Sequence, residues 1–269
     1  MILDLFCEEI CVIRRGEKML FDTHIHLDQF LDEEIKQILQ QPNLESVLAV
    51  ATDLASCEGL LALKERYSNL YIASGFHPEQ TLPSENELEK LFDFIAKNYQ
   101  KLTACGEVGL PHYLKRENPE LDYQPYIDLL ERFIVASKRY NLPLNLHIVY
   151  EDTEIALELL ARHQIQKAHF HWFKASNETL EKLLLTPYFV SLTPDILTNP
   201  KTQKVAQAFP LERLLIETDA PWQHEGFKPV EITQQLVAVI QKLAEIKQLP
   251  EKVVAEQISQ NTYSFYLTK

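Results

Sequence analysis

Short apolar runs recur along the chain and indicate buried strands. They lie at residues 20–24, 46–51, 71–76, 103–108, 143–147, 168–170, 188–192 and 214–217. Near-continuous apolar runs of this kind are typical of a parallel sheet that is covered by other elements. The pattern therefore predicts eight parallel strands.

Longer amphipathic segments separate most of these runs. Their apolar residues recur at the three- and four-residue spacing of a helix that buries one face. The spacing is clearest for Tyr126, Leu129, Leu130, Phe133, Ile134 and Ser137, and for Leu236, Val239, Ile240 and Leu243. Strands and helices are thus predicted to alternate along the chain.

Eight strands with intervening helices favour a closed α/β architecture, the (β/α)8 TIM-like barrel. An open doubly wound sheet is the alternative, but it would not easily bring residues from five separate strands to one point. We predict a single-domain barrel over residues 19–269. Residues 1–18 are predicted to be an N-terminal extension of uncertain structure, and no linker or repeat indicates a second domain.

The first apolar run ends in a His-x-His pair, His24 and His26. Alternate residues of a strand project to the same face, so both imidazoles can reach one metal ion if the strand continues through His26. A pair of structural histidines explains the dipeptide alone about equally well, because short motifs often occur by chance. A metal site requires further ligands downstream.

Four such candidates follow other apolar runs: Glu107, His147, His171 and Asp219. A closed barrel would gather them with the histidine pair. Imidazole and carboxylate ligands suit divalent ions such as zinc or manganese, and a set without thiolates disfavours a structural cysteine–zinc site. The six groups form a candidate metal centre.

The composition of the 269 residues limits the functions to be considered. With 46% hydrophobic and 24% charged residues, the chain lies in the ordinary globular range. Its 26 basic residues against 39 acidic ones give a formal charge of −13, which implies no general surface for polyanions and weak affinity for duplexes. Two divalent ions would nevertheless make the pocket locally cationic, which favours small or end-bound substrates.

The remaining sequence features point to a cytoplasmic protein. Cys7, Cys11, Cys57 and Cys105 show no paired C-x-x-C spacing, so reduced thiols are expected. Residues 1–18 contain charged side chains and no long apolar stretch, so neither a signal peptide nor a membrane span is predicted. The chain also lacks the glycine-rich motifs of dinucleotide and P-loop nucleotide sites.

With these residues assembled, the chain after Met19 resembles the TatD family of metal-dependent hydrolases, within the amidohydrolase-like barrels. The resemblance rests on residues 21–28, 75–78, 106–110, 143–147, 171–173 and 217–221, which read FDTHIHLD, GFHP, GEVGL, PLNLH, HWF and ETDAP. It implies one ion held by His24, His26, Glu107 and Asp219, and a second held by Glu107, His147 and His171. Glu107 would bridge the two ions.

The same resemblance implies hydrolysis of a phosphoester substrate, often at the ends of nucleic acids, by a water bound at the metals. We expect Asp219 to accept a proton from this water, and His77 to contact the substrate or assist the leaving group. Zinc or manganese is favoured, with nickel, iron or magnesium as the other candidates. Single-stranded or end-bound nucleic acid is the expected substrate, and the sequence identifies no protein partner.

Three departures from the family pattern bear on the substrate. Pro111 stands where Asp is usual, Val149 where Arg often follows the fifth-strand histidine, and Lys174-Ala175 where Ser-Gly is usual. The missing Arg removes a bidentate anion contact. Lys174 is either a replacement charge or a solvated loop lysine, and Trp222 either stacks on a base or sugar or serves packing.

Other polar residues have predicted places in the barrel. His169 is expected to be a core histidine, with orientation of a ligand as the alternative, while Asp22 and Glu217 either orient ligands or form interior hydrogen-bonded pairs. Three histidines are expected at the surface: His112, His163 and His224.

Two other functions stay open at this point. One is a small-molecule phosphoesterase, lactonase or amidohydrolase, although such sites commonly bridge their metals with a modified lysine instead of a residue such as Glu107. The other is a noncatalytic metal-binding or adaptor barrel, against which the complete set of six ligands argues.

Overall fold

The computed structural model describes residues 20–268, so the extension predicted for residues 1–18 lies outside the described part. Eight parallel strands form one sheet in which each strand pairs with the next along the chain. They are β1 (Leu20–Ile25), β2 (Leu44–Val50), β3 (Leu70–Ser74), β4 (Ala104–Gly109), β5 (Leu144–His147), β6 (Ala168–Phe170), β7 (Phe189–Leu192) and β8 (Leu214–Ile216). Each apolar run overlaps one strand, which confirms the predicted eight.

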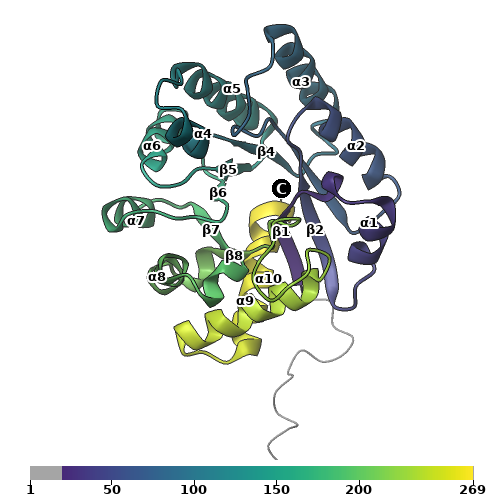
Figure 1. Cartoon of the computed structure of the whole chain (residues 1–269), viewed down its shortest axis with the longest axis vertical. Helices are drawn as coiled ribbons and strands as arrows, with labels where there is room; N and C mark the ends of the chain where they lie inside the picture. The colour runs from purple at the N-terminus through teal and green to yellow at the C-terminus, as the bar shows by residue number, and fades with distance from the viewer. Residues whose placement is uncertain (1–19, 269) are drawn as a thin grey trace, which may run out of the picture.

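The sheet closes between β1 and the segment that follows β8. The backbone N–H of Asp219 donates to the carbonyl of His24 at 3.0 Å, and that of His26 donates to the carbonyl of Ala220 at 2.8 Å. The strands surround a common centre with the helices outside them (Figure 1). The single-domain barrel is therefore confirmed over the described residues, and the open doubly wound alternative is wrong.

Helices cover the outside of the barrel. They are α1 (Asp32–Leu39), α2 (Leu54–Lys64), α3 (Glu85–Asn98), α4 (His112–Glu117), α5 (Gln124–Tyr140), α6 (Asp152–Arg162), α7 (Asn177–Leu184), α8 (Pro200–Ala208), α9 (Ile232–Lys247) and α10 (Glu251–Thr262), with the short turns η1 (Leu27–Gln29), η2 (Pro194–Leu197), η3 (Leu211–Arg213) and η4 (Tyr263–Leu267). The two predicted amphipathic patterns fall in α5 and α9, where their apolar residues are buried.

Local sequence explains where several helices begin. Asp53 caps α2 by accepting the backbone N–H of Ser56, and Ser84 caps α3 by accepting that of Glu87. Such side chains satisfy amide groups that the first turn of a helix leaves unpaired. No helix within residues 20–268 is both long and apolar enough to cross a bilayer.

The segment after α10 fills the barrel interior below the strand ends. Phe265 and Tyr266 of η4, which we call the C-terminal plug, pack with inward residues of β1, β2, β3, β4 and β8. Lys167 holds the segment by donating to the carbonyls of Ser264, Phe265 and Thr268 at 3.3, 3.1 and 3.0 Å. In Figure 1 the yellow end of the chain accordingly lies near the centre of the ring of strands.

Strands β4 and β5 approach so closely that only glycine fits at one contact. A Cβ atom at Gly109 would lie 2.0 Å from the carbonyl oxygen of His147, whereas one at Gly59 in α2 would meet nothing within 4 Å. Real Cβ atoms cannot come so close to a backbone oxygen, so a larger residue at position 109 would push the end of β5 away.

The first prediction compares these two glycines. Gly109→Ala should lower the free energy of unfolding by about 1–3 kcal/mol, because the strands must separate. The matched Gly59→Ala should be neutral or stabilising by about 0.5–1 kcal/mol, because alanine suits a helix better than glycine. Urea unfolding measures both changes, and equal stabilities for the two variants would contradict the close approach of β4 and β5.

Candidate metal centre

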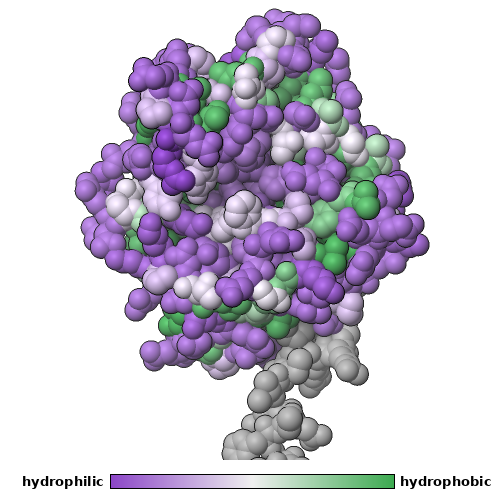
Figure 2. Space-filling model, viewed as in Figure 1, coloured by the Kyte–Doolittle hydropathy of each residue, from purple (hydrophilic) through white to green (hydrophobic). Residues whose placement is uncertain are grey.

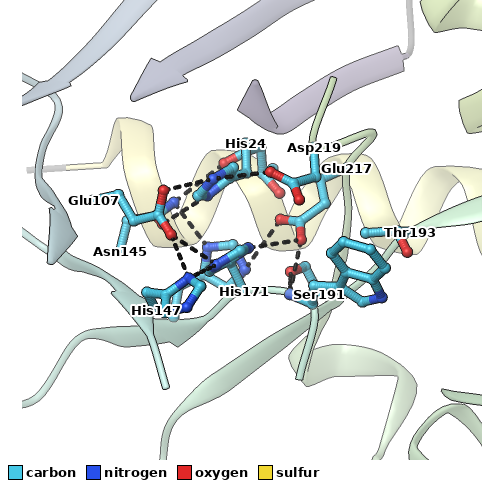
Figure 3. Close-up of polar contacts among 12 residues, drawn as sticks. His24, Glu107, Asn145, His147, His171, Ser191, Thr193, Glu217 and Asp219 are labelled. Carbon is cyan, nitrogen blue, oxygen red and sulfur yellow. Dashed lines mark hydrogen bonds and ion pairs between the residues drawn. The ribbon is translucent and has the colours of Figure 1, made fainter. Parts of the chain in front are cut away.

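The structure brings all six predicted ligand residues to the C-terminal mouth of the barrel. They lie in or just after β1, β4, β5, β6 and β8, and are His24, His26, Glu107, His147, His171 and Asp219. Figure 3 shows five of them directed toward a common centre. Strand β1 ends at Ile25 and does not continue through His26, which instead precedes η1. The two imidazoles still lie side by side, with ring centroids 5.2 Å apart.

Four donor atoms form the first group: Nε2 of His24, Nε2 of His26, Oε2 of Glu107 and Oδ1 of Asp219. Each of these nitrogens lies 3.2–3.4 Å from each of the two oxygens. Ligands that share one zinc ion, with bonds of about 2.0–2.2 Å, have comparable separations. The donor atoms of His24, Glu107 and Asp219 are also buried without a hydrogen-bond partner. Such atoms are costly to leave unpaired, so this group fits a divalent cation.

Glu107 presents its other oxygen, Oε1, to a second group. His147 Nδ1 lies 2.8 Å and His171 Nε2 lies 2.9 Å from this oxygen, and the two nitrogens are 3.1 Å apart. His77 Nε2 lies 3.5 Å from the same oxygen. The carboxylate therefore faces one group of donors with each oxygen, which is the arrangement required of a bridging ligand.

Glu79 holds the far side of His147. Its Oε1 lies 3.4 Å from His147 Nε2, and its two oxygens accept the backbone N–H groups of Tyr113 and Leu114 at 2.8 and 2.7 Å. Burial opposes ionisation of Glu79, but these hydrogen bonds outweigh it and hold its pKa below the ordinary value. Carboxylates in this position orient metal-binding imidazoles. Sequence analysis missed Glu79, although it lies two residues after the candidate His77.

Glu217 and Asp22, the two inward carboxylates, differ in what they contact. Glu217 Oε1 lies 3.5 Å from His171 Nδ1, so this carboxylate can orient a candidate ligand. Asp22 instead accepts from Thr218 N at 3.1 Å, Thr218 Oγ1 at 2.5 Å and His24 N at 3.2 Å. Burial raises the pKa of Asp22 to about 8. Asp22 thus links β1 to the segment after β8. Its carboxylate contacts none of the candidate metal-ligand atoms.

The charges of the centre support one another. Burial favours the neutral form of each side chain, but the attraction between imidazoles and carboxylates outweighs it. The pKa is lowered for Glu107 and Asp219, and raised for His26, His147 and His171. Glu107 and Asp219 are therefore favoured as anions, which suits them to bind a cation. Without a bound cation, the protonated forms of the neighbouring imidazoles are favoured.

His77 is the exception among the clustered histidines. Burial lowers the pKa of His77 to about 4, with nearby imidazoles adding to the effect and Glu107 opposing it. Its Nδ1 accepts the backbone N–H of Glu79 at 3.2 Å. In the neutral ring the proton must then lie on Nε2. His77 consequently directs an N–H group toward the second group of donors.

A pocket of about 370 Å³ is lined by Lys174 and Trp222, two of the three predicted substrate contacts, and by Trp172, which directly follows the candidate ligand His171. The third predicted contact, His77, lies with the second group of donors. The Lys174 ammonium lies 3.5 Å from Asp195 Oδ2 and 3.9 Å from the centroid of the Trp172 ring, with 13% of its side chain exposed. Lys174 is therefore not a solvated loop lysine. Trp222 is 59% exposed and meets Trp172 edge-on at 5.6 Å. Sequence analysis did not identify Trp172 or Asp195.

Other histidines show where sequence reasoning succeeded and failed. His169 is fully buried, which confirms it as a core residue. His224 is also buried and donates to the carbonyl of Thr218 at 2.9 Å, so its predicted surface position is wrong. His224 lies in the loop after β8, where its ring packs edge-on against Trp172 at 5.4 Å. His112 and His163 are partly exposed and lie beside carboxylates.

The mouth is open to solvent in part. The side chains of His26 and His147 are 12% exposed, that of Asp219 is 11% exposed and that of His77 is 22% exposed. In the view of Figure 2 the surface is mainly hydrophilic and is hollowed near the centre of the ring of strands. A polar substrate can therefore approach the donor atoms.

Comparisons with known proteins agree with this geometry. A family model described as TatD related DNase matches residues 21–267. A Haemophilus influenzae protein named an uncharacterized metal-dependent hydrolase is 60% identical over 249 residues, which cover 92% of this chain and 99% of that protein. Human deoxyribonuclease TATDN3 is 28% identical over 215 residues, covering 75% and 78%. The crystal structure of YjjV, a TatD homologue from Escherichia coli, has a TM-score of 0.79 at 27% identity and covers 94% of this chain and 99% of its own.

The second prediction concerns ion content and stability. The protein should contain two divalent ions per chain by elemental analysis. A chelator should lower its stability by about 2.7 kcal/mol for each ion removed, or about 5 kcal/mol in all, relative to protein with ion at a hundred times the dissociation constant of each site. Glu107→Gln should lose ion from both groups, because the amide nitrogen cannot replace a ligand oxygen. Glu89→Gln on the exposed side of α3 is the control. Unchanged ion content in Glu107→Gln would contradict the bridging role.

Proposed function

Because this chain belongs to the TatD family of metal-dependent hydrolases, we propose that it uses two divalent ions to cleave phosphodiester bonds in nucleic acid. The observation that carries the proposal is the division of the Glu107 oxygens between two groups of donors at the barrel mouth. The deoxyribonuclease named among its relatives supports this substrate class.

We assign the ligands by these two groups. The first ion would be held by His24, His26, Glu107 and Asp219, and the second by Glu107, His147 and His171. His77 Nε2 lies 3.5 Å from the Glu107 oxygen of the second group, but it carries a proton and would have no lone pair to offer an ion. Nitrogen-rich sets of this kind favour zinc or manganese, with nickel, iron or magnesium as the other candidates.

The proposed reaction gives two side chains separate roles, one as proton acceptor and one as hydrogen-bond donor. Bound ions would lower the pKa of a water molecule and polarise the phosphoryl oxygen. Asp219 is held as an anion beside His24 and His26, so its carboxylate can accept the proton of the attacking water. His77, which is neutral, can donate a hydrogen bond from Nε2–H to the departing oxygen and stabilise the charge that develops there, and the oxygen then takes its proton from solvent.

The pocket beside the centre supplies the proposed substrate contacts. The Lys174 ammonium can bind a phosphate of the substrate, which compensates for Val149 where the family often has Arg. The exposed face of Trp222 can stack on an unpaired base. With a net charge of −13, the protein has no broad basic surface for a duplex, so single-stranded or end-bound nucleic acid is the favoured substrate.

Two further proposals concern the extent of the catalytic domain and the cellular location. Residues 19–269 form the catalytic domain, which the match of the family model to residues 21–267 supports. The protein works in the cytoplasm, and two observations support this. Cys57 and Cys105 are buried free thiols, and the described helices contain no candidate membrane span.

The third prediction tests the chemistry with a panel of substrates. Zinc- or manganese-loaded protein should cleave single-stranded DNA and should do so much less with duplex DNA, a lactone or an amide. Asp219→Asn should lower kcat by about 10²–10⁴-fold, because an amide cannot accept the proton, while circular dichroism stays unchanged. Asp93→Asn on the exposed surface of α3 is the matched control. Cleavage confined to the lactone or the amide would refute the proposed substrate, and full activity of Asp219→Asn would refute the base.

The fourth prediction tests the pocket. Lys174→Ala and Trp222→Ala should each raise KM for single-stranded DNA about fivefold or more, because a base–aromatic contact is worth about 1–3 kcal/mol and a phosphate contact is comparable. The kcat value should change little, since neither side chain reaches the reacting atoms. Lys97→Ala, on exposed α3, should leave both constants unchanged. An unchanged KM in either pocket variant would remove that residue from the substrate site.

A further inference from the structure

A buried chain of hydrogen bonds joins the C-terminal plug to a proposed ligand of the first ion. Tyr266 Oη lies 2.6 Å from His169 Nδ1 and 3.1 Å from Asn145 Nδ2. Asn145 Oδ1 in turn lies 2.9 Å from His24 Nδ1 (Figure 3). All four residues are buried, and Asn145, His169 and His24 have no exposed surface. Tyr266, which lies four residues after the end of α10, is thus linked to His24 through two successive hydrogen bonds.

The orientation of the Asn145 amide follows from the acceptors around its nitrogen. Nδ2 lies 3.3 Å from the carbonyl oxygen of Thr23, 3.1 Å from Tyr266 Oη and 3.3 Å from His169 Nδ1. The Tyr266 hydroxyl donates its own proton to His169 Nδ1, so its oxygen is free to accept from the amide. An amide nitrogen carries two N–H bonds, and both find acceptors on this side. The carbonyl oxygen of the amide is therefore left to face His24.

This orientation selects the tautomer of His24. An amide oxygen can only accept, so His24 Nδ1 must carry the proton, and a neutral imidazole then has its lone pair on Nε2. Nε2 is the atom that lies 3.2 Å from Glu107 Oε2 and 3.4 Å from Asp219 Oδ1. A rotated amide would direct N–H toward Nδ1 and require the proton on Nε2, where it would block an ion.

We propose that Tyr266 and Asn145 are positioning residues for the metal centre. The Tyr266 hydroxyl fixes the amide of Asn145, and the amide fixes the tautomer of His24 that can bind the first ion. This inference rests on the proposed function, because it requires His24 to be a ligand. It gives the C-terminal plug a second role, since the plug that fills the barrel interior also sets the affinity of the site above it.

The closing experiment measures ion affinity directly. Metal-free protein is titrated with zinc in competition with a chromophoric chelator, which reports two equivalents separately. Tyr266→Phe should weaken one equivalent by about 10-fold and leave the other unchanged, because partners that orient a ligand are worth about 10–100-fold in affinity. Tyr188→Phe is the matched control, since its buried hydroxyl donates to the carbonyl of Ile165 at 3.1 Å far from the centre. Equal affinities in the two variants would overturn the role of Tyr266.

A second pair of variants separates tautomer selection from packing. Asn145→Leu removes the acceptor for His24 Nδ1 and should weaken one equivalent by about 10–100-fold. Asn145→Asp keeps an acceptor oxygen and should recover most of that affinity. Equal losses in the two variants would overturn the proposal, because packing alone would then account for them. Wild-type protein that binds neither zinc nor manganese, nickel, iron or magnesium would instead refute the proposed function, so the two failures are distinguishable.

Discussion

The candidate site depends on one buried carboxylate, Glu107, that has imidazoles on both sides and no lysine or arginine among its contacts within the described chain. A buried anion is stable only when it is paired and hydrogen-bonded. Here the pairing comes from β1, β5 and β6 through His24, His147 and His171, at 2.8–3.2 Å from one or other oxygen. The barrel must therefore close correctly before this charge is compensated, and the backbone bonds between β1 and the segment after β8 are part of the site as much as of the fold.

The interior of the barrel changes character along its axis. At one end the C-terminal plug packs against apolar strand residues, and at the other the donor atoms of His24, Glu107 and Asp219 are buried without hydrogen-bond partners. Asn145 and His169 lie between the two. Asn145 hydrogen-bonds to Tyr266 below and to His24 above, and His169 hydrogen-bonds to Tyr266. A buried polar layer is costly where its members lack partners. The amide of Asn145 is paired through both its nitrogen and its oxygen, whereas His169 Nε2 has no hydrogen-bond partner and lies 3.7 Å from Glu217 Oε2.

Sequence analysis predicted the strands and the six candidate ligands because both have local signatures. A strand has an apolar run, and an active-site residue of a barrel follows the end of one. Glu79, Asn145 and Tyr266 have no such signature, since their contacts join residues from distant parts of the chain. The surroundings of Lys174 could not be predicted from the sequence either. Its charge is visible in the sequence, but its burial against Trp172 and Asp195 depends on how two loops meet. The predicted surface position of His224 was wrong for the same reason. Its burial depends on how the loop after β8 packs against Trp172, and the sequence does not show this.

The two oxygens of Glu107 face different groups of donor atoms, and this arrangement also bears on the geometry of the proposed reaction. Asp219 lies with the group that faces Oε2, and His77 lies with the group that faces Oε1. The proposed proton acceptor and the proposed donor to the leaving group therefore stand on opposite sides of one bridging side chain. Displacement at phosphorus brings the attacking oxygen and the departing oxygen into line on opposite faces. A phosphodiester placed across Glu107 would meet Asp219 at one face and the Nε2–H of His77 at the other. The carboxylate that pairs with both groups of imidazoles therefore also separates the proposed proton acceptor from the proposed hydrogen-bond donor.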